Sequence, residues 1–252
     1  MGGASGGRAA RSGAPTVSGA RLGIVHGHSL PAGTSLEGIG PGGEGEEGQP
    51  PVVFLPRHGL DLSTPAHLVD HAANVRVLCE AGCDRVLALG SVGSLRVEGS
   101  LRTLICPHDF LAPGIAPSFF DDVRGHSVPG FDREWRRRVV AAWVERGELE
   151  LADGGVYAHV SGPRFETPAE VRALARDADV VGMTIAAEAI LAREAGLGYA
   201  AVCTIDNLAN GLANEPLTVE EYRRARDAFA PAVIADLERV LPALAAPAGA
   251  IG

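Results

Sequence analysis

The sequence predicts a single α/β domain with a central sheet flanked by helices. Short apolar runs alternate with amphipathic segments, and turns rich in Gly and Pro separate them. The clearest unit has a strand at Val156–Val160, a helix opened by Thr167-Pro168, a strand at Asp179–Val181 and a second helix after Gly182-Met183-Thr184. Thr is a favourable N-cap, and Pro suits the first helical position. This order of elements is typical of a crossover α/β unit.

The length and composition support one globular domain. The chain has 252 residues, of which 46% are hydrophobic, enough to bury a sizeable core. The net charge of −9 argues against nucleic-acid binding, which needs basic patches. The four cysteines form no CxxC pair, so we expect a reduced cytoplasmic protein and no metal site. We find no signal peptide and no apolar run of about 18 residues, and therefore expect no membrane span.

The other elements follow from the same patterns. We expect further strands at Arg21–Val25, Pro51–Leu55, Arg85–Leu89, Leu101–Cys106 and Leu197–Val202. We expect further helices from Thr64-Pro65 to Gly82, at Asp132–Val144, and from Val219 to about Leu241. The domain would then span residues 21–241. Residues 1–20 form a predicted disordered tail, residues 31–50 a surface loop, and residues 242–252 a flexible tail.

Several chemically suitable side chains follow predicted strands, at the sheet edge where open α/β folds usually bind ligands. Arg57 offers a planar fork of donors that matches phosphate oxygens, and His58 adds a further donor. The small residues of Gly90–Ser94 let backbone amides approach a ligand, although their order is neither a Walker nor a dinucleotide fingerprint. Thr184 stands at a helix start, where amides and the helix dipole favour anions. These residue types suit an anion such as phosphate, although an isolated Arg-His pair is more often part of a surface loop and a Gly-rich loop alone is a weak signal.

The segment Gly162-Pro-Arg-Phe-Glu-Thr-Pro-Ala-Glu170, followed by Gly182-Met183-Thr184 and a helix carrying Glu188, resembles the trimeric purine nucleoside phosphorylase and methylthioadenosine phosphorylase family. The resemblance covers roughly residues 21–240. It implies a single-domain, three-layer α/β/α fold with a central mixed, partly barrel-like sheet. It also implies a homotrimer, or a hexamer built as a dimer of trimers, that uses a purine nucleoside and inorganic phosphate and needs no metal or organic cofactor.

The resemblance assigns roles to individual residues. Phosphate would be bound by His28, Ser29, Arg57, His58, Gly90, Ser91 and Thr184. The nucleoside would contact Val92, Gly93, Phe165, Glu166, Gly182, Met183, Asn207 and Val219. Phe120 and His126, on the long loop 111–131, would reach the site of a neighbouring subunit. His28 stands where the family carries a hydroxyl residue, so either Ser29 or backbone amides replace that hydroxyl, or the phosphate site is altered.

The base-reading residue depends on the register near the end of the strand that begins at residue 197. A direct count places Ile205 at the family's Asp or Asn position, and a shift of one or two residues brings in Asp206 or Asn207. The run Asn207-Leu-Ala-Asn-Gly211 fits some 6-oxopurine members, so we predict Asn207, donating its amide to the leaving purine. Asp206 is the alternative, and it would donate a proton to N7 and make adenine nucleosides acceptable. We take Asn207, Asp206 and His58 as the candidate catalytic residues.

The predicted substrate follows from Glu166. A carboxylate accepts a hydrogen bond from N1–H of a 6-oxopurine, whereas the bare N1 of adenine would repel it. Leu217-Thr218-Val219 resembles the branch in which an apolar side chain faces a 5′-methylthio group, and no His follows His159. The sequence thus predicts phosphorolysis of inosine, guanosine or 5′-methylthioinosine to base and sugar 1-phosphate. The alternatives are a methylthioadenosine phosphorylase, and a hydrolase or non-catalytic nucleoside-binding protein with an altered phosphate site.

Overall fold

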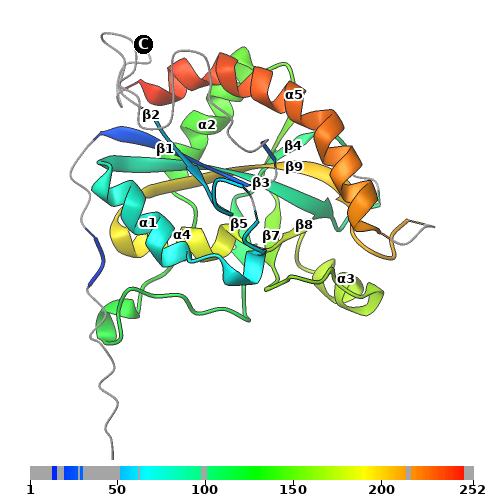
Figure 1. Cartoon of the computed structure of the whole chain (residues 1–252), viewed down its shortest axis with the longest axis horizontal. Helices are drawn as coiled ribbons and strands as arrows, with labels where there is room; N and C mark the ends of the chain where they lie inside the picture. The colour runs from blue at the N-terminus through cyan, green and yellow to red at the C-terminus, as the bar shows by residue number, and fades with distance from the viewer. Residues whose placement is uncertain are drawn as a thin grey trace, which may run out of the picture.

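The computed structural model describes residues 13–15, 20–27, 29–30, 52–61, 63–97, 101–213 and 217–246. Within these residues, nine strands form one sheet (Figure 1). The strands are β1 (Arg21–His26), β2 (Val52–Pro56), β3 (Cys83–Ser94), β4 (Leu104–Cys106), β5 (Asp109–Leu111), β6 (Leu151–Asp153), β7 (Val156–His159), β8 (Val180–Gly182) and β9 (Gly198–Leu208). The helices are α1 (His71–Glu80), α2 (Arg133–Arg146), α3 (Pro168–Leu174), α4 (Ile185–Ala195) and α5 (Val219–Ala245), with short 3₁₀ turns at Ala66–Leu68 and Val123–Gly125.

The sheet is mixed and curls into a half-barrel. The strand order is β5-β7-β8-β3-β9-β4-β6, and β1 pairs with both β2 and β3. The long strand β3 changes its partner along its length: its first half pairs in parallel with β1, and its end pairs antiparallel with β8. The predicted single-domain α/β fold with a mixed, partly barrel-like sheet is confirmed.

Helices cover both faces of the sheet (Figure 1). Helices α1 and α4 cover one face, where Leu78 and Leu191 lie in the same apolar core cluster. Helices α2 and α5 cover the other face, where Trp143 and Leu237 share a second cluster. The short helix α3 stands beside β7 and β8, and its Val171 belongs to a third cluster. The result is the three-layer arrangement that the sequence predicts.

The predicted helix from Thr64 to Gly82 is wrong in its first part. Residues 66–68 form a separate 3₁₀ turn, and α1 begins only at His71. Val69 is extended, with ψ of 123°, and so breaks the helical path. The Asp70 side chain then caps α1 by accepting a hydrogen bond from the amide of Ala73 at 2.9 Å. The short strands β5 and β6 were not predicted.

The predicted flexible tail from residue 242 is wrong as far as Ala245, since α5 continues to that residue. The guanidinium of Arg85 donates to the carbonyl oxygen of Ala245 at 2.9 Å and also reaches those of Leu244 and Ala246. These bonds satisfy carbonyl groups that a helix end leaves open. The predicted loop 31–50, residues 1–12 of the predicted N-terminal tail and residues 247–252 lie outside the described residues. No helix in the described ranges is long and apolar enough to span a membrane.

Candidate active site

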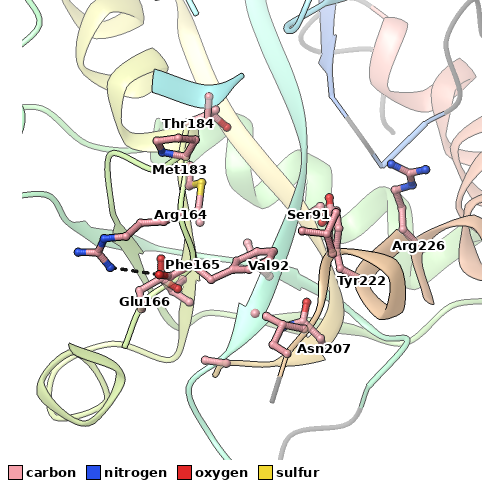
Figure 2. Close-up of a pocket in the computed structure, with 18 of the residues that line it drawn as sticks. Ser91, Val92, Arg164, Phe165, Glu166, Met183, Thr184, Asn207, Tyr222 and Arg226 are labelled. Atoms are coloured by element: carbon pink, nitrogen blue, oxygen red, sulfur yellow. Dashed lines mark hydrogen bonds between the residues drawn. The ribbon is translucent and has the colours of Figure 1, made fainter. Parts of the chain in front are cut away.

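A cavity of about 390 Å³ lies where β2, β3, β8 and β9 end, beside the start of α5 (Figure 2). Twelve of the predicted site residues line it: Arg57, His58, Ser91, Val92, Gly93, Phe165, Glu166, Gly182, Met183, Thr184, Asn207 and Val219. They come from segments that are widely separated in the sequence. In Figure 2, Thr184 and Met183 lie on the upper side of the cavity, with Glu166 and Asn207 on the lower side.

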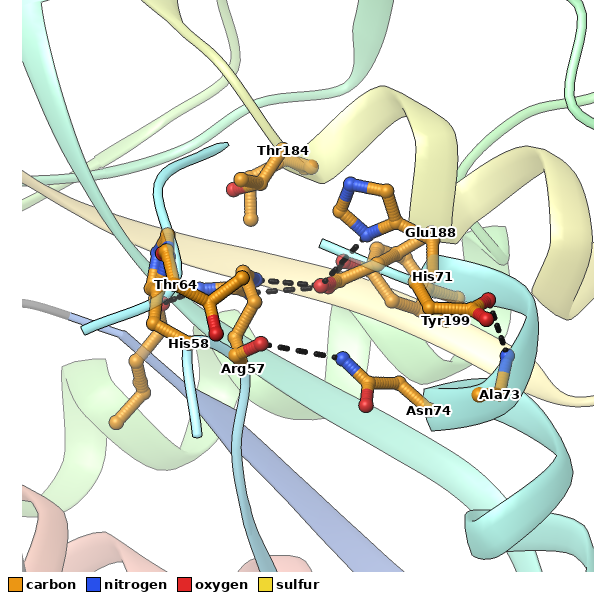
Figure 3. Close-up of polar contacts among 12 residues, drawn as sticks. Arg57, His58, Thr64, His71, Ala73, Asn74, Thr184, Glu188 and Tyr199 are labelled. Carbon is orange, nitrogen blue, oxygen red and sulfur yellow. Dashed lines mark hydrogen bonds and ion pairs between the residues drawn. The ribbon is translucent and has the colours of Figure 1, made fainter. Parts of the chain in front are cut away.

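Arg57 is buried, and three hydrogen bonds to two residues hold its guanidinium, those to Glu188 being drawn in Figure 3. Its Nε and Nη2 groups donate to the two carboxylate oxygens of Glu188, the second at 2.9 Å. Its Nη1 group donates to the carbonyl oxygen of Leu89 at 3.0 Å. A guanidinium has five N–H groups, so two remain for an anion in the cavity that Arg57 lines. This geometry suits phosphate.

His58 and Gly27 lie next to this guanidinium. The Nδ1 atom of His58 is 2.7 Å from the carbonyl oxygen of Thr64, which can only accept, so Nδ1 carries the proton. A Cβ atom at Gly27 would come within 3.0 Å of Arg57 Nη1 and 3.2 Å of His58 Nε2. Gly27 therefore allows the β1 turn to approach both groups. Ser29, the predicted phosphate ligand on this turn, is buried, and its Oγ has no partner among the described residues.

Two amides at the start of α4, those of Thr184 and Ile185, are already engaged, and the predicted role of this helix start in anion binding stays a prediction. The Tyr157 hydroxyl accepts hydrogen bonds from the amides of Thr184 at 3.2 Å and Ile185 at 3.4 Å. Gly182 permits this arrangement, because a Cβ atom there would lie 2.5 Å from the Tyr157 oxygen. Thr184 lines the cavity at this helix end, and its side chain makes no capping bond.

The register near Asn207 is set by a β-bulge. Val92 of β3 pairs with Ile205 of β9, but the next residue, Gly93, pairs with Asn207, so Asp206 is an extra residue. Ile205 packs in the apolar core beneath α1 and α4. Among the three residues of this turn, Asn207 lines the cavity. Its Nδ2 donates to the carbonyl oxygen of Leu208 at 2.8 Å.

Asp206 lies behind the cavity wall, bonded to hydroxyl groups. Its carboxylate accepts from Ser91 and, at 3.1 Å, from Thr204, and the Ser91 oxygen is 3.0 Å from the Tyr222 hydroxyl. Burial raises the pKa of Asp206 to about 6. The Ser91 hydroxyl is thus committed to Asp206, and it could contact phosphate only as an acceptor.

Four other predicted residues, Ser29, Gly90, Phe120 and His126, do not line the cavity. Gly90 is enclosed in the sheet, where a Cβ atom would lie 2.8 Å from Cys203 Sγ, and its phosphate contact stays a prediction. Phe120 lies under the Arg124 guanidinium, and His126 ends the nearby 3₁₀ turn. Their predicted contact with a neighbouring subunit stays a prediction. His28 lies outside the described residues.

Glu166 brings an acceptor to the cavity. It is buried, and burial raises the pKa of its carboxyl group. The Asn210 side chain fixes the local backbone by donating to the carbonyl oxygen of Glu166 at 2.9 Å. The capping box between Thr167 and Glu170 starts α3 directly after this segment, as the sequence predicts.

The chain matches the family model described as Phosphorylase superfamily over residues 19–242. It belongs to this family. Over 170 residues it is 41% identical to a probable 6-oxopurine nucleoside phosphorylase of Archaeoglobus fulgidus, with 68% of this chain and 70% of that protein covered. Over 202 residues it is 39% identical to a probable S-methyl-5′-thioinosine phosphorylase of Pseudomonas syringae, with 76% and 81% covered. The chain is therefore a pentosyltransferase of the nucleoside phosphorylase type.

A methylthioadenosine phosphorylase of Schistosoma mansoni, solved with adenine, has a similar fold. Its TM-score is 0.74 at 22% sequence identity, and the match covers 90% of this chain and 91% of that one. At this identity the likeness supports the fold alone, and it agrees with the half-barrel described above.

One wall of the cavity, formed by α5, was predicted only at Val219. Tyr222, Arg223 and Arg226 of α5 line it together with Val219 (Figure 2). Their spacing of three, four and seven residues from Val219 places them on one helix face. Since Val219 was predicted to face the nucleoside, this helical period could have identified all three. The Tyr222 ring also meets Phe165 edge to face, with ring centroids 6.2 Å apart.

Proposed function

We propose that the enzyme catalyses the phosphate-dependent cleavage of the N-glycosidic bond of 6-oxopurine nucleosides, with 5′-methylthioinosine as the preferred substrate and inosine and guanosine as alternatives. The observation that carries the proposal is the composition of one cavity. Arg57 and Thr184 supply donors suited to phosphate, His58 adds a ring nitrogen beside them, and Glu166 and Asn207 supply an acceptor and a donor suited to a 6-oxopurine. The names of the two relatives reported above support the same substrate class.

The reaction needs phosphate to be held beneath the sugar. A phosphate oxygen forms a bond to C1′ as the bond from C1′ to the purine nitrogen breaks, and the electron pair leaves with the purine, which takes up a proton. The two remaining N–H groups of Arg57, with His58 and the Thr184 hydroxyl, would orient the nucleophile. Asn207 would exchange its bond to Leu208 for one to the purine, stabilising the negative charge that develops there. The proposed reaction uses no metal or organic cofactor.

The apolar part of the α5 wall supports a 5′-methylthio substituent. Leu217 and Val219 line the cavity where α5 begins. A methylthio group gains from burial against such side chains, at roughly 0.8 kcal/mol for each buried methylene-sized group. A 5′-hydroxyl would lose hydrogen bonds to water at an apolar wall. This contrast favours 5′-methylthioinosine over inosine.

We further propose that the enzyme works in the cytoplasm as a homotrimer. The loop 111–131 lies against α4, where the Glu194 carboxylate accepts a hydrogen bond from Ser118 Oγ at 2.7 Å. This contact would present Phe120 and His126 to a neighbouring copy. Sedimentation of a fully active enzyme as a monomer at micromolar concentration would contradict a shared site.

The test is a base-release assay on 5′-methylthioinosine, inosine and 5′-methylthioadenosine, each with and without inorganic phosphate. We expect release to require phosphate and kcat/KM to be highest for 5′-methylthioinosine. Release that is equally fast without phosphate would indicate a hydrolase. Equal kcat/KM for methylthioinosine and methylthioadenosine would favour a methylthioadenosine phosphorylase.

A further inference from the structure

A buried polar network lies directly behind the proposed phosphate site, and the proposed function assigns it no role. Its centre is Glu188, in the first turn of α4, whose side chain is 2% exposed. Besides Arg57, the carboxylate contacts the Tyr199 hydroxyl at 2.7 Å and His71 Nδ1 at 3.5 Å (Figure 3). Glu188, Tyr199 and His71 do not line the cavity, whereas Arg57 does. Arg57 is therefore the member of the network that can meet substrate.

The geometry of the pair fixes the plane of the guanidinium. Glu188 takes the Nε and Nη2 side, and the Leu89 carbonyl takes one N–H of Nη1. A bidentate carboxylate leaves a guanidinium little freedom to rotate. The Arg57 backbone is held as well, since Asn74 Nδ2 donates to its carbonyl oxygen at 3.3 Å. The two remaining N–H groups therefore point in a direction that the protein has set before any ligand binds.

Glu188 is itself held in place and charged. The Tyr199 hydroxyl donates to it from β9, and burial raises the pKa of Tyr199, so this donor keeps its proton. Burial opposes the carboxylate form of Glu188, but the Arg57 guanidinium outweighs burial and holds its pKa well below the usual range. The ion pair has no net charge. Recognition of phosphate by Arg57 then depends on the alignment of its donors more than on an unbalanced positive charge.

We propose that Glu188 is the positioning residue of the phosphate site: it orients the Arg57 guanidinium so that two N–H groups meet phosphate, and Tyr199 supports it from behind. This inference rests on the proposed function. It predicts that changes at Glu188 weaken phosphate binding while nucleoside binding, which involves other residues, stays nearly unchanged.

The test uses Glu188→Gln and Glu188→Asp in the full chain. Gln keeps the shape but replaces one acceptor oxygen with a donor, and Asp keeps the charge but shortens the side chain. We expect both variants to raise the Kd for inorganic phosphate, measured by calorimetry, and its KM by about tenfold or more, with the KM for the nucleoside within about twofold. Tyr199→Phe should raise the phosphate Kd in the same direction by a smaller factor.

The matched control is Asp236→Asn. Asp236 is a buried carboxylate on α5 that accepts from the amides of Glu148 and Leu149 and from Arg239, and it does not line the cavity. This control should lower the melting temperature and leave the phosphate Kd unchanged. Folded Glu188 variants that bind phosphate as tightly as the unmodified protein, or more tightly, would overturn the inference. If Glu188→Gln does not fold, the phosphate affinities of Glu188→Asp and Tyr199→Phe test the inference in the same way.

The outcomes separate this inference from the proposed function. If the unmodified protein neither binds inorganic phosphate nor requires it for base release, the proposed function fails, whatever the variants do. If the unmodified protein does both and the folded Glu188 variants keep their phosphate affinity, only the role of Glu188 fails.

Discussion

Glu166 and Asn207 face one cavity with opposite hydrogen-bonding character. The Glu166 carboxylate accepts, and the Asn207 amide can donate. A 6-oxopurine satisfies the carboxylate through N1–H, whereas adenine would leave it unpaired. A buried unpaired acceptor costs about 1–3 kcal/mol, and a charged one costs more.

Glu166→Ser should therefore narrow the preference for 6-oxopurines. We expect the ratio of kcat/KM for methylthioinosine to that for methylthioadenosine to fall by about tenfold or more. Glu170→Gln, which removes an exposed carboxylate from the same segment, should preserve the ratio. An unchanged ratio in Glu166→Ser would show that Glu166 does not read the base.

The raised pKa of Asp206 makes the free energy of unfolding depend on pH. Burial raises the folded-state pKa of Asp206 from 3.8 to about 6, so the folded protein binds this proton more tightly than the unfolded chain does. The stabilisation that comes from this proton on Asp206 is fully present below about pH 4 and is lost as the pH rises through about 6. The difference of about two pKa units between the folded and unfolded states corresponds to about 3 kcal/mol of folding stability.

Asp206→Asn should remove this contribution. Its free energy of unfolding in urea, relative to that of the unmodified protein, should rise between about pH 4 and 6.5 and then stay constant. Buried His26 and His159, whose pKa burial lowers to about 4, change stability in the opposite direction. Because these histidines are present in both proteins, the difference isolates Asp206. A difference that is independent of pH would contradict the assignment.

Some site residues could be predicted from the sequence, and others could not. Arg57 and His58 could be predicted because they directly follow a strand. The extra residue at Asp206 could not, because a bulge depends on the pairing of β3 with β9. The pair of Arg57 with Glu188 joins residues 131 positions apart, and the Tyr157 contact with Thr184 links a strand to a later helix. Contacts between residues so far apart in the chain cannot be predicted from a local sequence pattern.

At the scale of elements, helix α5 connects the cavity to the beginning of the central strand β3. Its first turns carry Val219 and Tyr222 into the cavity wall, and its last turn is fixed by Arg85, far from the site. The capping box at Thr218 and Glu221 makes its start predictable. Its end was not, since Pro242 suggested an earlier stop and the Arg85 contact comes from a strand 160 residues away.

Arg85→Gln should separate stability from catalysis. The variant loses charge-assisted hydrogen bonds to the last carbonyl groups of α5, worth about 2 kcal/mol together, and should melt several degrees lower. The kcat/KM at 25 °C should be unchanged, because the first turns of α5 keep their cap and their core contacts. A calorimetric scan and a steady-state assay check both points. A large fall in kcat/KM with no change in melting temperature would contradict this division of roles.

At the scale of the whole molecule, the sheet brings together ends that are distant in the chain. Arg57 follows β2, Ser91 lies in β3, Thr184 follows β8 and Asn207 lies in β9. The half-barrel curvature gathers these residues around one cavity. The alternation of strands and helices in the sequence was sufficient to predict the α/β class and the edge. The curvature could not be predicted from local pattern, because it arises where β3 exchanges β1 for β8.

In the proposed reaction phosphate, not water, takes the sugar from the purine. Phosphorus NMR of a reaction containing 5′-methylthioinosine, inorganic phosphate and enzyme tests it most directly. We expect one new sugar-phosphate resonance that grows in step with free hypoxanthine, and no hypoxanthine when phosphate is left out. Hypoxanthine released without a new phosphorus resonance would contradict the account.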